Sequence, residues 1–320
     1  MKLIKSDASL INESNPLKLV ELIGRTCYKS EDKITDDSCY KFVDNLASRK
    51  HYAMLEHANL LFEIRGIPGM YSDIISTPYV RYTSKYFETT KETVQYLSVS
   101  LSHIARWRDK DILLSLNSYQ IFRGMDYCFQ DKYINEESKS NGKCAVTLSD
   151  DRKVYIKLLD SVEDIINVDD EDRDKHQFYT VKFICDRGVS HEFARHRCAV
   201  AQESTRYCRY GQGKFGSDIE FIQPANYENW SSQAQNTFIY SCQNAEDCYK
   251  HMTENYGMTP QEARAVLNNA LKTEIILTMP RWQWKHFFDL RYFGTTGQPH
   301  PDAKLVSGIA YTKMHDMNII

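Results

Sequence analysis

The chain has 320 residues, of which 42% are hydrophobic and 26% are charged, and its formal net charge is -3. A globular protein of this length and composition can bury a large core without disulfides or structural metals. The slightly negative charge disfavours broad electrostatic binding to nucleic acid or to an anionic membrane, because such binding requires many lysines and arginines. We therefore expect neither nucleic acid nor a membrane as a partner.

The N-terminus and the cysteines both bear on the cellular compartment. Lys2, Lys5 and Asp7 place charge before any signal-peptide core, and no apolar run approaches the roughly 20 residues that cross a bilayer. The nine cysteines are scattered from Cys27 to Cys248 without a Cys-x-x-Cys pair, which fits a reducing environment. We therefore expect a soluble, cytoplasmic protein.

The first part of the chain predicts a helix and a strand. Asn15 is a suitable helix cap, Pro16 takes the first helical position, and an apolar run follows, so we expect a helix over residues 15–24 that ends near Gly24. From residue 59 to residue 64 the pattern of apolar residues predicts a strand with at least one face in a core.

The middle of the chain gives weaker signals. We expect a helix around residues 97–107, a loop over residues 135–143, and a solvated acidic connector over residues 169–174. No repeat or low-complexity linker separates this stretch from the rest of the chain. We therefore expect a single domain, residues 1–320, with an insertion at about residues 86–176.

The next segment predicts a strand, a turn and a helix. Residues 178–185 are rich in aromatic and β-branched side chains, and Asp186-Arg187-Gly188 interrupts them. Ser190 can cap a following helix that carries Glu192 in its first turn.

Two further helices are predicted towards the C-terminus. Thr259-Pro260-Gln261-Glu262 is a capping box with proline at the first helical position, and it opens a predicted helix through Leu271. After Pro280, helical spacing places four residues on one face, namely Trp284, Phe287, Phe288 and Arg291. We expect the arginine to lie at the edge of a core or a pocket.

Positive charge is concentrated between Arg187 and Tyr210. Five arginines lie there against two glutamates, an excess of three positive charges in an otherwise acidic protein. The planar guanidinium group suits bidentate binding of phosphate or carboxylate, so the segment predicts a local anion site. The alternative is a solvated basic helix, which is the usual role of a charged run.

The same segment contains His191-Glu192-Phe193-Ala194-Arg195-His196, which superficially resembles a zinc-binding His-Glu-x-x-His helix. The two histidines are five residues apart rather than four, so they do not share one helix face. The flanking arginines would also repel a divalent cation. We therefore expect no metal site.

The arginine-rich segment also carries an ordered motif, in which Arg195-His196-Arg197 leads into Gln202-Glu203-Ser204-Thr205-Arg206-Tyr207. An Arg-His-Arg triplet followed by a carboxylate, a serine and Arg-Tyr is the hallmark of the flavin-dependent thymidylate synthases, which this chain resembles. Further blocks match in the family order and cover roughly residues 15–65 and 177–300. They are Arg25–Tyr28, Leu55–His57, Arg187–Glu192, Glu262–Leu267, Leu271–Thr273 and Trp284–Arg291.

This resemblance implies a fold and a chemistry. It implies an α/β fold of the α+β type, with a central, mainly antiparallel sheet flanked by helices, in a homotetramer whose active sites lie between subunits. It also implies methylation of dUMP to dTMP, with methylenetetrahydrofolate as the carbon donor, FAD as the cofactor and NADPH as the reductant. Both FAD and dUMP carry phosphates, which agrees with the basic segment.

The resemblance further implies roles for individual residues. The cofactor-binding residues would be Arg195, His196, Arg197, Glu203 and His286. The dUMP-binding residues would be Glu192, Gln202, Ser204, Arg206, Arg264 and Arg291. The catalytic residues would be Arg291, Ser204 and His57, with His57 near the flavin ring. His57 has an equally good alternative role as a core histidine at a strand edge.

Two other functions could use the arginines alone. A nucleotide- or single-stranded nucleic-acid-binding protein could use the basic cluster from Arg195 to Arg209, with some of the 21 tyrosines as stacking surfaces. A flavin-free nucleotide hydrolase could use the same arginines to hold phosphates. Neither function explains the ordered blocks near residues 55, 264 and 291. Visible flavin in the purified protein would distinguish the flavoenzyme from both.

Overall fold

The computed structural model describes residues 1–77, 80–112, 114–135, 140–206, 210 and 218–320. The strands are β1 (Lys2–Ile4), β2 (Asp7–Ile11), β3 (Asn59–Arg65), β4 (Val80–Phe87), β5 (Glu92–Ser100), β6 (Lys143–Thr147), β7 (Lys153–Leu158), β8 (Phe178–Asp186), β9 (Ala199–Gln202), β10 (Glu220–Ile222) and β11 (Lys272–Pro280).

The α-helices are α1 (Pro16–Tyr28), α2 (Ser38–Ser48), α3 (Tyr52–Leu55), α4 (Ser72–Ile75), α5 (Leu101–Arg108), α6 (Leu116–Tyr133), α7 (Asp170–His176), α8 (Arg187–Phe193), α9 (Ser232–Glu254), α10 (Pro260–Ala263), α11 (Arg281–Phe288) and α12 (Pro301–Asp316). Short 3-10 turns are η1 (Glu31–Lys33), η2 (Val162–Asp164), η4 (Tyr227–Asn229) and η5 (Arg264–Val266), and η6 (Asp289–Phe293) is a π-helical turn. Within the described part of the chain, no helix is both long and apolar enough to pass through a membrane.

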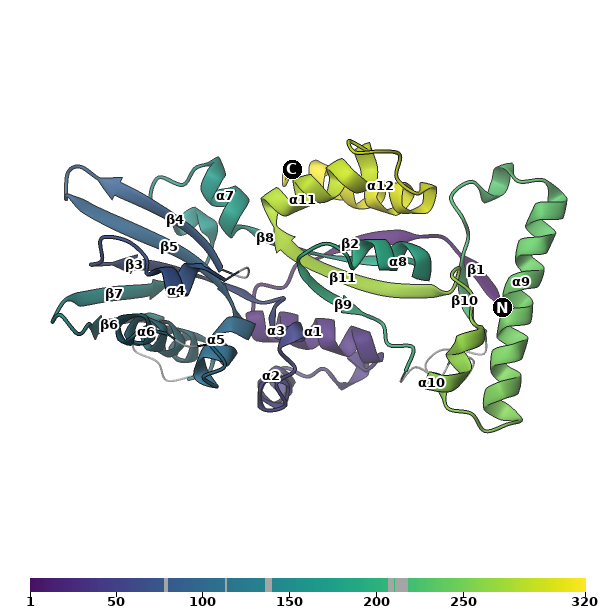
Figure 1. Cartoon of the computed structure of the whole chain (residues 1–320), viewed down its shortest axis with the longest axis horizontal. Helices are drawn as coiled ribbons and strands as arrows, with labels where there is room; N and C mark the ends of the chain where they lie inside the picture. Colours follow the sequence, from purple (N-terminus) through teal and green to yellow (C-terminus); the bar gives the residue numbers. More distant parts are fainter. Residues whose placement is uncertain (78–79, 113, 136–139, 207–209, 211–217) are drawn as a thin grey trace.

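The strands form two larger antiparallel sheets and one small parallel pair. The central sheet has the order β2-β8-β11-β9, the middle-segment sheet has the order β4-β5-β3-β7-β6, and β1 pairs with β10. Figure 1 shows the two larger sheets side by side along the long axis, with α9 at the opposite end from the middle-segment sheet. The predicted α+β class, with mainly antiparallel strands flanked by helices, is confirmed, although the strands are divided between two larger sheets and the β1–β10 pair.

Strand β11 organises the central sheet. It pairs with β8 along its whole length, from Lys272 opposite Asp186 to Pro280 opposite Phe178. On its other side it pairs with β9, which places Gln202 opposite Ile275. Every residue of β11 is buried, because strands flank both of its edges and helices cover both faces of the sheet. The segment that follows β9 is thereby held against a rigid strand.

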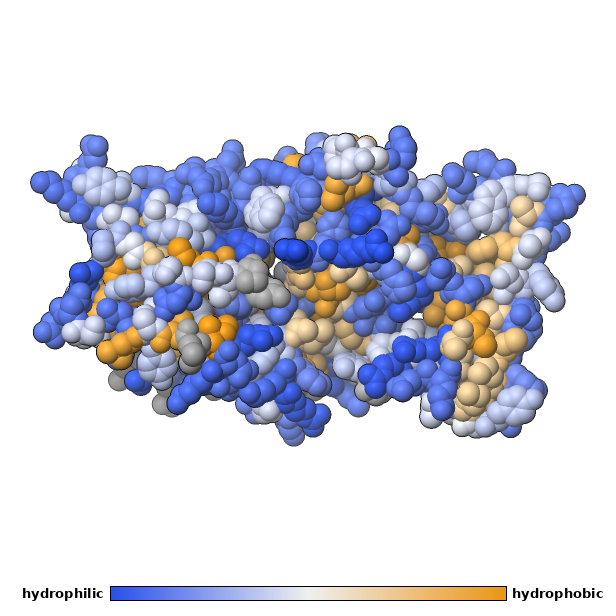
Figure 2. All heavy atoms as spheres, in the orientation of Figure 1, coloured by the Kyte–Doolittle hydropathy of each residue, from blue (hydrophilic) through white to orange (hydrophobic). Residues whose placement is uncertain are grey.

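The hydrophobic cores explain how the helices are placed. One core lies between the central sheet and α8, α11 and α12, and includes Phe183, Phe193 and Phe287. On the other face of this sheet, α1 packs through Ile23 and Cys27. A larger core lies between the middle-segment sheet and α1–α6. Figure 2 shows strongly hydrophilic residues near the middle of the visible face and at several other places on it, with hydrophobic residues visible between them.

Helix α1 starts where the sequence predicts and ends later. The Asn15 side chain accepts hydrogen bonds from the first-turn amides, and Pro16 is the first helical residue, as expected. Gly24 does not end the helix. A β-carbon at Gly24 would lie 2.6 Å from the Phe42 ring, so the glycine permits close packing of α2. The helix ends at Tyr28, and Lys29 caps it in the left-handed conformation.

Two of the predictions for the middle segment are wrong in part. The helix expected around residues 97–107 is α5 only from Leu101, because the preceding residues pair with β3 and β4 as strand β5. Ser100 marks the change, since its side chain caps α5. The loop expected over residues 135–143 lies partly outside the described residues, and Lys143 begins β6. That this stretch is an insertion within a single domain stays a prediction.

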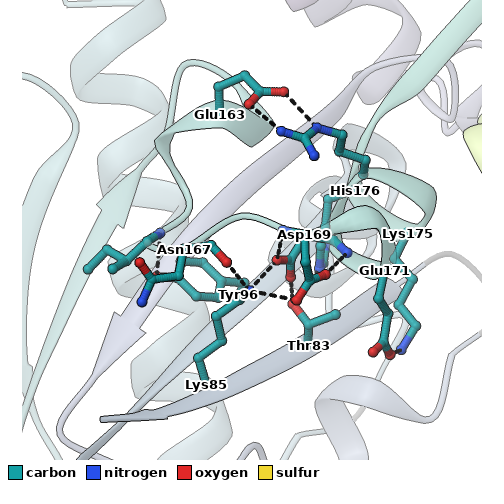
Figure 3. A network of polar contacts seen from close by, with 12 residues as sticks. Thr83, Lys85, Tyr96, Glu163, Asn167, Asp169, Glu171, Lys175 and His176 are labelled. Carbon is teal, nitrogen blue, oxygen red and sulfur yellow. Dashed lines mark hydrogen bonds and ion pairs between the residues drawn. The ribbon is translucent and has the colours of Figure 1, made fainter.

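The acidic run is a helix rather than a solvated connector. Asp169 and Asp172 form a capping box at the start of α7, and Asp172 is buried. Figure 3 shows the polar network that fastens α7 to the middle-segment sheet, with Lys85 beside Asp169 and Thr83. In this network Asp172 accepts a hydrogen bond from Thr83 and pairs with Lys85. The His176 ring bridges Thr83 and Ser98 at 2.9 and 2.8 Å. These partners lie far from residues 169–174 in the sequence, so the acidic residues by themselves gave no sign that some of them are buried.

Two element boundaries towards the C-terminus also differ from the predictions. Asp186, rather than Ser190, caps α8, and the residues expected to form a turn are its first turn. The capping box at Thr259 is confirmed, but α10 ends at Ala263. The chain beyond it forms the 3-10 turn η5 and is then not helical up to Leu271; at the end of this stretch Ala270 and Leu271 hydrogen-bond and bridge to β10.

Candidate functional site

The candidate site is built around the stretch from α8 to Arg206. The chain leaves α8 at Phe193, turns through residues 194–198, follows β9 along the central sheet, and continues to Arg206. Because β9 is fixed by its pairing with β11, the residues on either side of this short strand have defined positions. The α10–η5 region and η6 supply the other side chains.

Arg291 joins two of the predicted site residues. Its Nη1 donates to the Glu192 carboxylate at 2.7 Å, its Nη2 donates to the Glu192 carbonyl at 3.0 Å, and its Nε donates to His196 Nε2 at 3.1 Å. Arg291 lies in η6, directly after α11, whose aromatic face is buried as predicted. The guanidinium group is therefore held at three points, at the edge of a packed core.

His196 is a neutral hydrogen-bond acceptor. Burial lowers its pKa to about 4, and the positive charges of Arg291 and His286 act in the same direction. Since arginine can only donate, His196 Nε2 must be the acceptor, which leaves the ring proton on Nδ1. The ring packs on Phe287 with a centroid distance of 4.9 Å.

Glu203 lies in a buried network of charges. Its carboxylate is 3.0 Å from Lys272 Nζ, which is itself 2.8 Å from Glu274. Lys29 also contacts Glu274 and lies 3.9 Å from Glu203. Burial alone would lower the pKa of Lys272, but Glu203 and Glu274 outweigh it and raise that pKa above its usual range. Glu203 is therefore held in one position by its lysine partner as part of the wall behind the site.

The residues after Glu203 pack against the α10–η5 region. Arg206 Nε donates to Gln261 at 2.8 Å, and Arg264 Nη1 donates to the Thr205 hydroxyl at 2.8 Å. The Ser204 hydroxyl accepts from the Arg206 amide at 3.3 Å. The structure thus brings Ser204 and Arg206 close to Arg264, which lies about 60 positions further along the sequence. Tyr207 and Arg209 lie outside the described residues.

Gln202 points to the interior of the site segment. Its side-chain amide donates to the Ser190 hydroxyl at 2.8 Å and to the Thr273 hydroxyl at 3.3 Å. These contacts tie β9 to α8 and β11. They position the segment, and the predicted contact of Gln202 with dUMP stays a prediction.

Arg195, Arg197 and His286 have exposed side chains. The Arg197 carbonyl accepts a hydrogen bond from Gln283 at 2.9 Å, which orients the turn before β9 towards α11. Arg195 and Arg197 flank His196 in sequence, and His286 lies near it in space. The predicted cofactor-binding residues are therefore neighbours, except for Glu203, which faces Lys272 and Lys29.

His57 is buried, with 1% of its surface exposed. Its Nδ1 lies 2.7 Å from the Thr278 hydroxyl, which is 2.8 Å from the Thr180 hydroxyl. Burial lowers its pKa to about 3, so the ring is neutral. It lines a cavity of about 500 Å³ between the two larger sheets. This environment agrees with its alternative role as a core histidine, and its catalytic role stays a prediction.

Sequence reasoning missed the lysines that hold Glu203. Lys272 lies within a block that matches the resembled family and Lys29 directly follows another, but nothing in their spacing indicates that both meet the same carboxylates. In the part of the chain that is described, no group of three or more His, Cys, Asp or Glu side chains is placed to hold a metal ion.

Comparisons with known proteins give consistent results. Residues 9–93 and 120–302 match the model of the family described as thymidylate synthase complementing protein. The flavin-dependent thymidylate synthase of Geobacter sulfurreducens is 33% identical over 106 residues, which are 33% of this chain and 43% of that protein. That of Thermococcus onnurineus is 32% identical over 117 residues, 33% of this chain and 42% of that protein. These alignments thus span less than half of either relative's length.

Among solved structures, the UMP/dUMP methylase PolB from Streptomyces cacaoi bound with 5-Br dUMP is similar with a TM-score of 0.36. It is 17% identical and covers 43% of this chain and 66% of that chain. The same protein bound with 5-Br UMP gives a TM-score of 0.37 and 18% identity, with 45% of this chain and 71% of that chain covered.

Proposed function

The chain belongs to the thymidylate synthase complementing protein family, and we propose from this that it methylates dUMP to dTMP, with methylenetetrahydrofolate as the carbon donor, FAD as the cofactor and NADPH as the reductant. One observation carries the proposal beyond family membership. Ser204 and Arg206 meet Arg264 across the fold, close to the end of the strand that follows the Arg-His-Arg triplet. A hydroxyl and two guanidinium groups are a suitable set for a nucleotide phosphate.

The described contacts fit this assignment. Arg264 donates to a neutral hydroxyl rather than to a carboxylate, so its positive charge is available to a phosphate. Arg206 donates to the neutral amide of Gln261. A bound dUMP phosphate would then gain charge-assisted hydrogen bonds, which are roughly twice as strong as those between neutral groups.

Arg291 is the residue that we assign to the uracil ring. Glu192 and His196 hold its guanidinium group in one orientation, and a preorganised donor can stabilise negative charge that develops on a ring carbonyl without further reorganisation. The remaining Glu192 oxygen can accept a hydrogen bond from the base or the ribose. Because His196 is neutral, it adds no positive charge that would compete with Arg291.

The same segment fits a flavin cofactor. Arg195 and Arg197 present exposed guanidinium groups that suit its phosphates, with His196 between them and His286 nearby. When bound, the reduced flavin supplies the hydride of the reaction, while the protein binds and orients the reactants. We further propose that the enzyme is a cytoplasmic homotetramer with active sites between subunits, which would complete the exposed Arg195–Arg197 region with residues of another copy.

Absorption spectroscopy and product analysis test the proposal. The purified protein with added FAD should show a flavin band near about 450 nm that shifts when dUMP is added. It should form dTMP only when dUMP, methylenetetrahydrofolate, NADPH and FAD are all present. A protein that leaves the spectrum of added FAD unchanged and forms no dTMP would refute the proposed function. Sedimentation analysis tests the tetramer separately.

A further inference from the structure

Two cysteines of the middle segment lie in contact, far from the candidate site. Cys128 is on α6 and Cys144 is on β6, 16 positions further along the chain, and their sulfur atoms are 3.4 Å apart. Both are free thiols, and among the cysteines that the structure describes they are the two that contact each other through sulfur. The pair therefore differs from the other described cysteines, each of which is a single thiol.

The packing of α6 on the middle-segment sheet brings these two sulfurs together. Figure 1 shows α6 beside β6 and β7 at one end of the molecule. Gly124 lies one helical turn before Cys128, on the same face of α6. A β-carbon at Gly124 would lie 2.5 Å from the Ile156 side chain and 3.2 Å from the Cys144 sulfur, so the glycine permits the close approach of helix and sheet.

Ile156 of β7 fixes the height of both cysteines on the sheet. It is the ladder partner of Cys144, and its carbonyl oxygen lies 3.7 Å from the Cys128 sulfur. Asp131 holds the chain that enters β6, because its carboxylate accepts hydrogen bonds from the Ser140 hydroxyl and from the Gly142 amide. The contact between the sulfurs is thus set by the sheet register and by the anchored start of β6.

The two thiols differ in accessibility and in acidity. Cys128 is 0% exposed, whereas Cys144 is partly exposed. The Cys128 thiol donates to the Cys144 sulfur, and this hydrogen bond lowers the pKa of Cys144 although burial and Asp131 act in the opposite direction. The same hydrogen bond and burial raise the pKa of Cys128. Cys144 is therefore the thiol that an external reagent reaches and the one that more readily becomes a nucleophilic thiolate.

The strand that carries Cys144 has room to move towards the helix. A disulfide bond is about 2.05 Å long, so the two sulfurs must approach by roughly 1.4 Å from their present distance. Strand β6 is at the edge of its sheet and pairs with β7 alone. A small shift of β6 therefore disturbs a single ladder of hydrogen bonds.

We propose that Cys128 and Cys144 form a reversible disulfide that fastens the edge strand β6 to α6 when low-molecular-weight disulfides, such as oxidised glutathione, accumulate. The inference goes beyond the proposed function and does not depend on it. In the reducing environment that the sequence predicts, the two thiols are the resting form, and disulfides in such an environment are usually transient.

The exchange takes place in two steps. The Cys144 thiolate attacks one sulfur of the small disulfide, forms a mixed disulfide with it and releases one small thiolate. Cys128 then loses its proton and attacks the Cys144 sulfur, which releases the second small thiolate. The protein loses two electrons and two protons, and the small disulfide gains both and becomes two thiols.

Peptide mapping of the wild-type protein tests the linkage directly. The folded protein is incubated with excess oxidised glutathione, its remaining thiols are blocked with iodoacetamide, and it is digested with trypsin without reduction. Lys132 and Lys143 lie between the two cysteines, so trypsin separates the cysteines unless a bond joins their peptides. We expect one joined pair, two hydrogens lighter than the separate peptides, that dithiothreitol resolves. Glutathione or the blocking group on both cysteines, with no joined pair, would overturn the proposal.

Serine variants test the order of the two steps. Cys128→Ser should retain glutathione on Cys144, because the second thiol is missing. Cys144→Ser should leave Cys128 to react at least about tenfold more slowly than Cys144 does in Cys128→Ser. Cys248→Ser, which removes a partly exposed single thiol on α9, is the control and should leave the linkage unchanged. Equal rates for the two cysteines would overturn the assigned order, and the wild-type map stays decisive if Cys128→Ser does not fold.

Thermal unfolding tests whether the bond fastens β6. A crosslink that closes a loop of this length should raise the unfolding midpoint of the oxidised wild type by roughly 3–6 °C over the reduced form. Oxidised glutathione should leave the midpoint of Cys144→Ser unchanged. A joined peptide pair with an unchanged or lower midpoint would show that the bond strains the fold instead of fastening it, and would overturn that part of the proposal.

Discussion

Replacing Lys272 by methionine tests the buried charge network behind the candidate site. Lys272 Nζ contacts Glu203 at 3.0 Å and Glu274 at 2.8 Å, and the three side chains are 1–11% exposed. Methionine keeps the length of the side chain and removes the charge. Among the described residues, Lys29 would then be the one lysine that reaches both carboxylates, at 3.9 Å from Glu203, while Lys182 stays 3.6 Å from Glu274.

Two estimates of the loss agree. Burial alone would raise the pKa of Glu274, but Lys272 and Lys29 outweigh it and hold that pKa at about 2, against a usual value near 4.5. That difference corresponds to about 3 kcal/mol of stability at neutral pH. Removing one partner of a buried ion pair costs about 3–5 kcal/mol by direct measurement in other proteins. We therefore expect Lys272→Met to lower the free energy of unfolding by about 3 kcal/mol at pH 7.

The pH dependence has a definite sign. Because the pKa of Glu274 is depressed in the folded state, its contribution is fully present above about pH 4.5 and is lost as the pH falls towards 2. The difference between wild type and Lys272→Met should therefore shrink by about 1 kcal/mol between pH 7 and pH 3.5. Urea unfolding at both pH values measures it.

The surface provides a matched control. Lys2 and Glu220 are 3.2 Å apart, nearly the same distance, but are 62% and 36% exposed, so Lys2→Met should cost less than about 1 kcal/mol. Adding Glu203→Gln to Lys272→Met should recover at least about 1 kcal/mol, because it removes an unpaired carboxylate. The reasoning is wrong if Lys272→Met costs no more than Lys2→Met, or if its cost does not change with pH.

Three further predictions concern the site and its support. Arg206→Ala and Arg264→Ala should each weaken dUMP binding more than FAD binding, by a further factor of at least about ten, or roughly 1.4 kcal/mol. Equal losses for the two ligands in paired titrations would show that the roles are misassigned. The Cys198→Ala protein should still form dTMP, because burial raises the pKa of Cys198 to about 12 and so disfavours a thiolate. A loss of turnover of about a thousandfold with both ligands still bound would indicate that Cys198 is a nucleophile. Asp172→Asn should lower the free energy of unfolding by about 2–4 kcal/mol, because Asp172 is buried and pairs with Lys85. Asp170→Asn, at an exposed position of the same helix, should lower it by less than about 1 kcal/mol. Similar urea midpoints for the two variants would contradict the role of the α7 network.

Local signals in the sequence were sufficient for several elements. The cap at Asn15, the capping box at Thr259, the strand pattern after residue 59 and the aromatic face of α11 are all found where they are predicted. Each depends on side chains within a few positions of one another, and such short-range preferences act in the isolated chain as they do in the folded protein. The ordered motif around Arg195 likewise indicated the family that the comparisons confirm.

The candidate site could be predicted as a set of residues but not as an arrangement. The sequence indicated Arg206, Arg264, Glu192 and Arg291, and the structure brings them together in two pairs of neighbouring segments. It did not indicate that Glu203 faces Lys272. A carboxylate and a lysine have no preferred spacing in sequence, because their pairing depends on which strands become neighbours.

Tertiary structure alone decided the elements whose hydrogen-bond partners or burial come from distant segments. The residues before Ser100 are a strand because β3 and β4 supply ladder partners. Ala270 and Leu271, which were expected in a helix, instead have their partners in β10. Asp172 is buried only because Thr83 and Lys85 satisfy its carboxylate. A backbone or side-chain polar group that loses water must find a partner, and where that partner lies far along the chain, folding determines the structure that the local pattern leaves open.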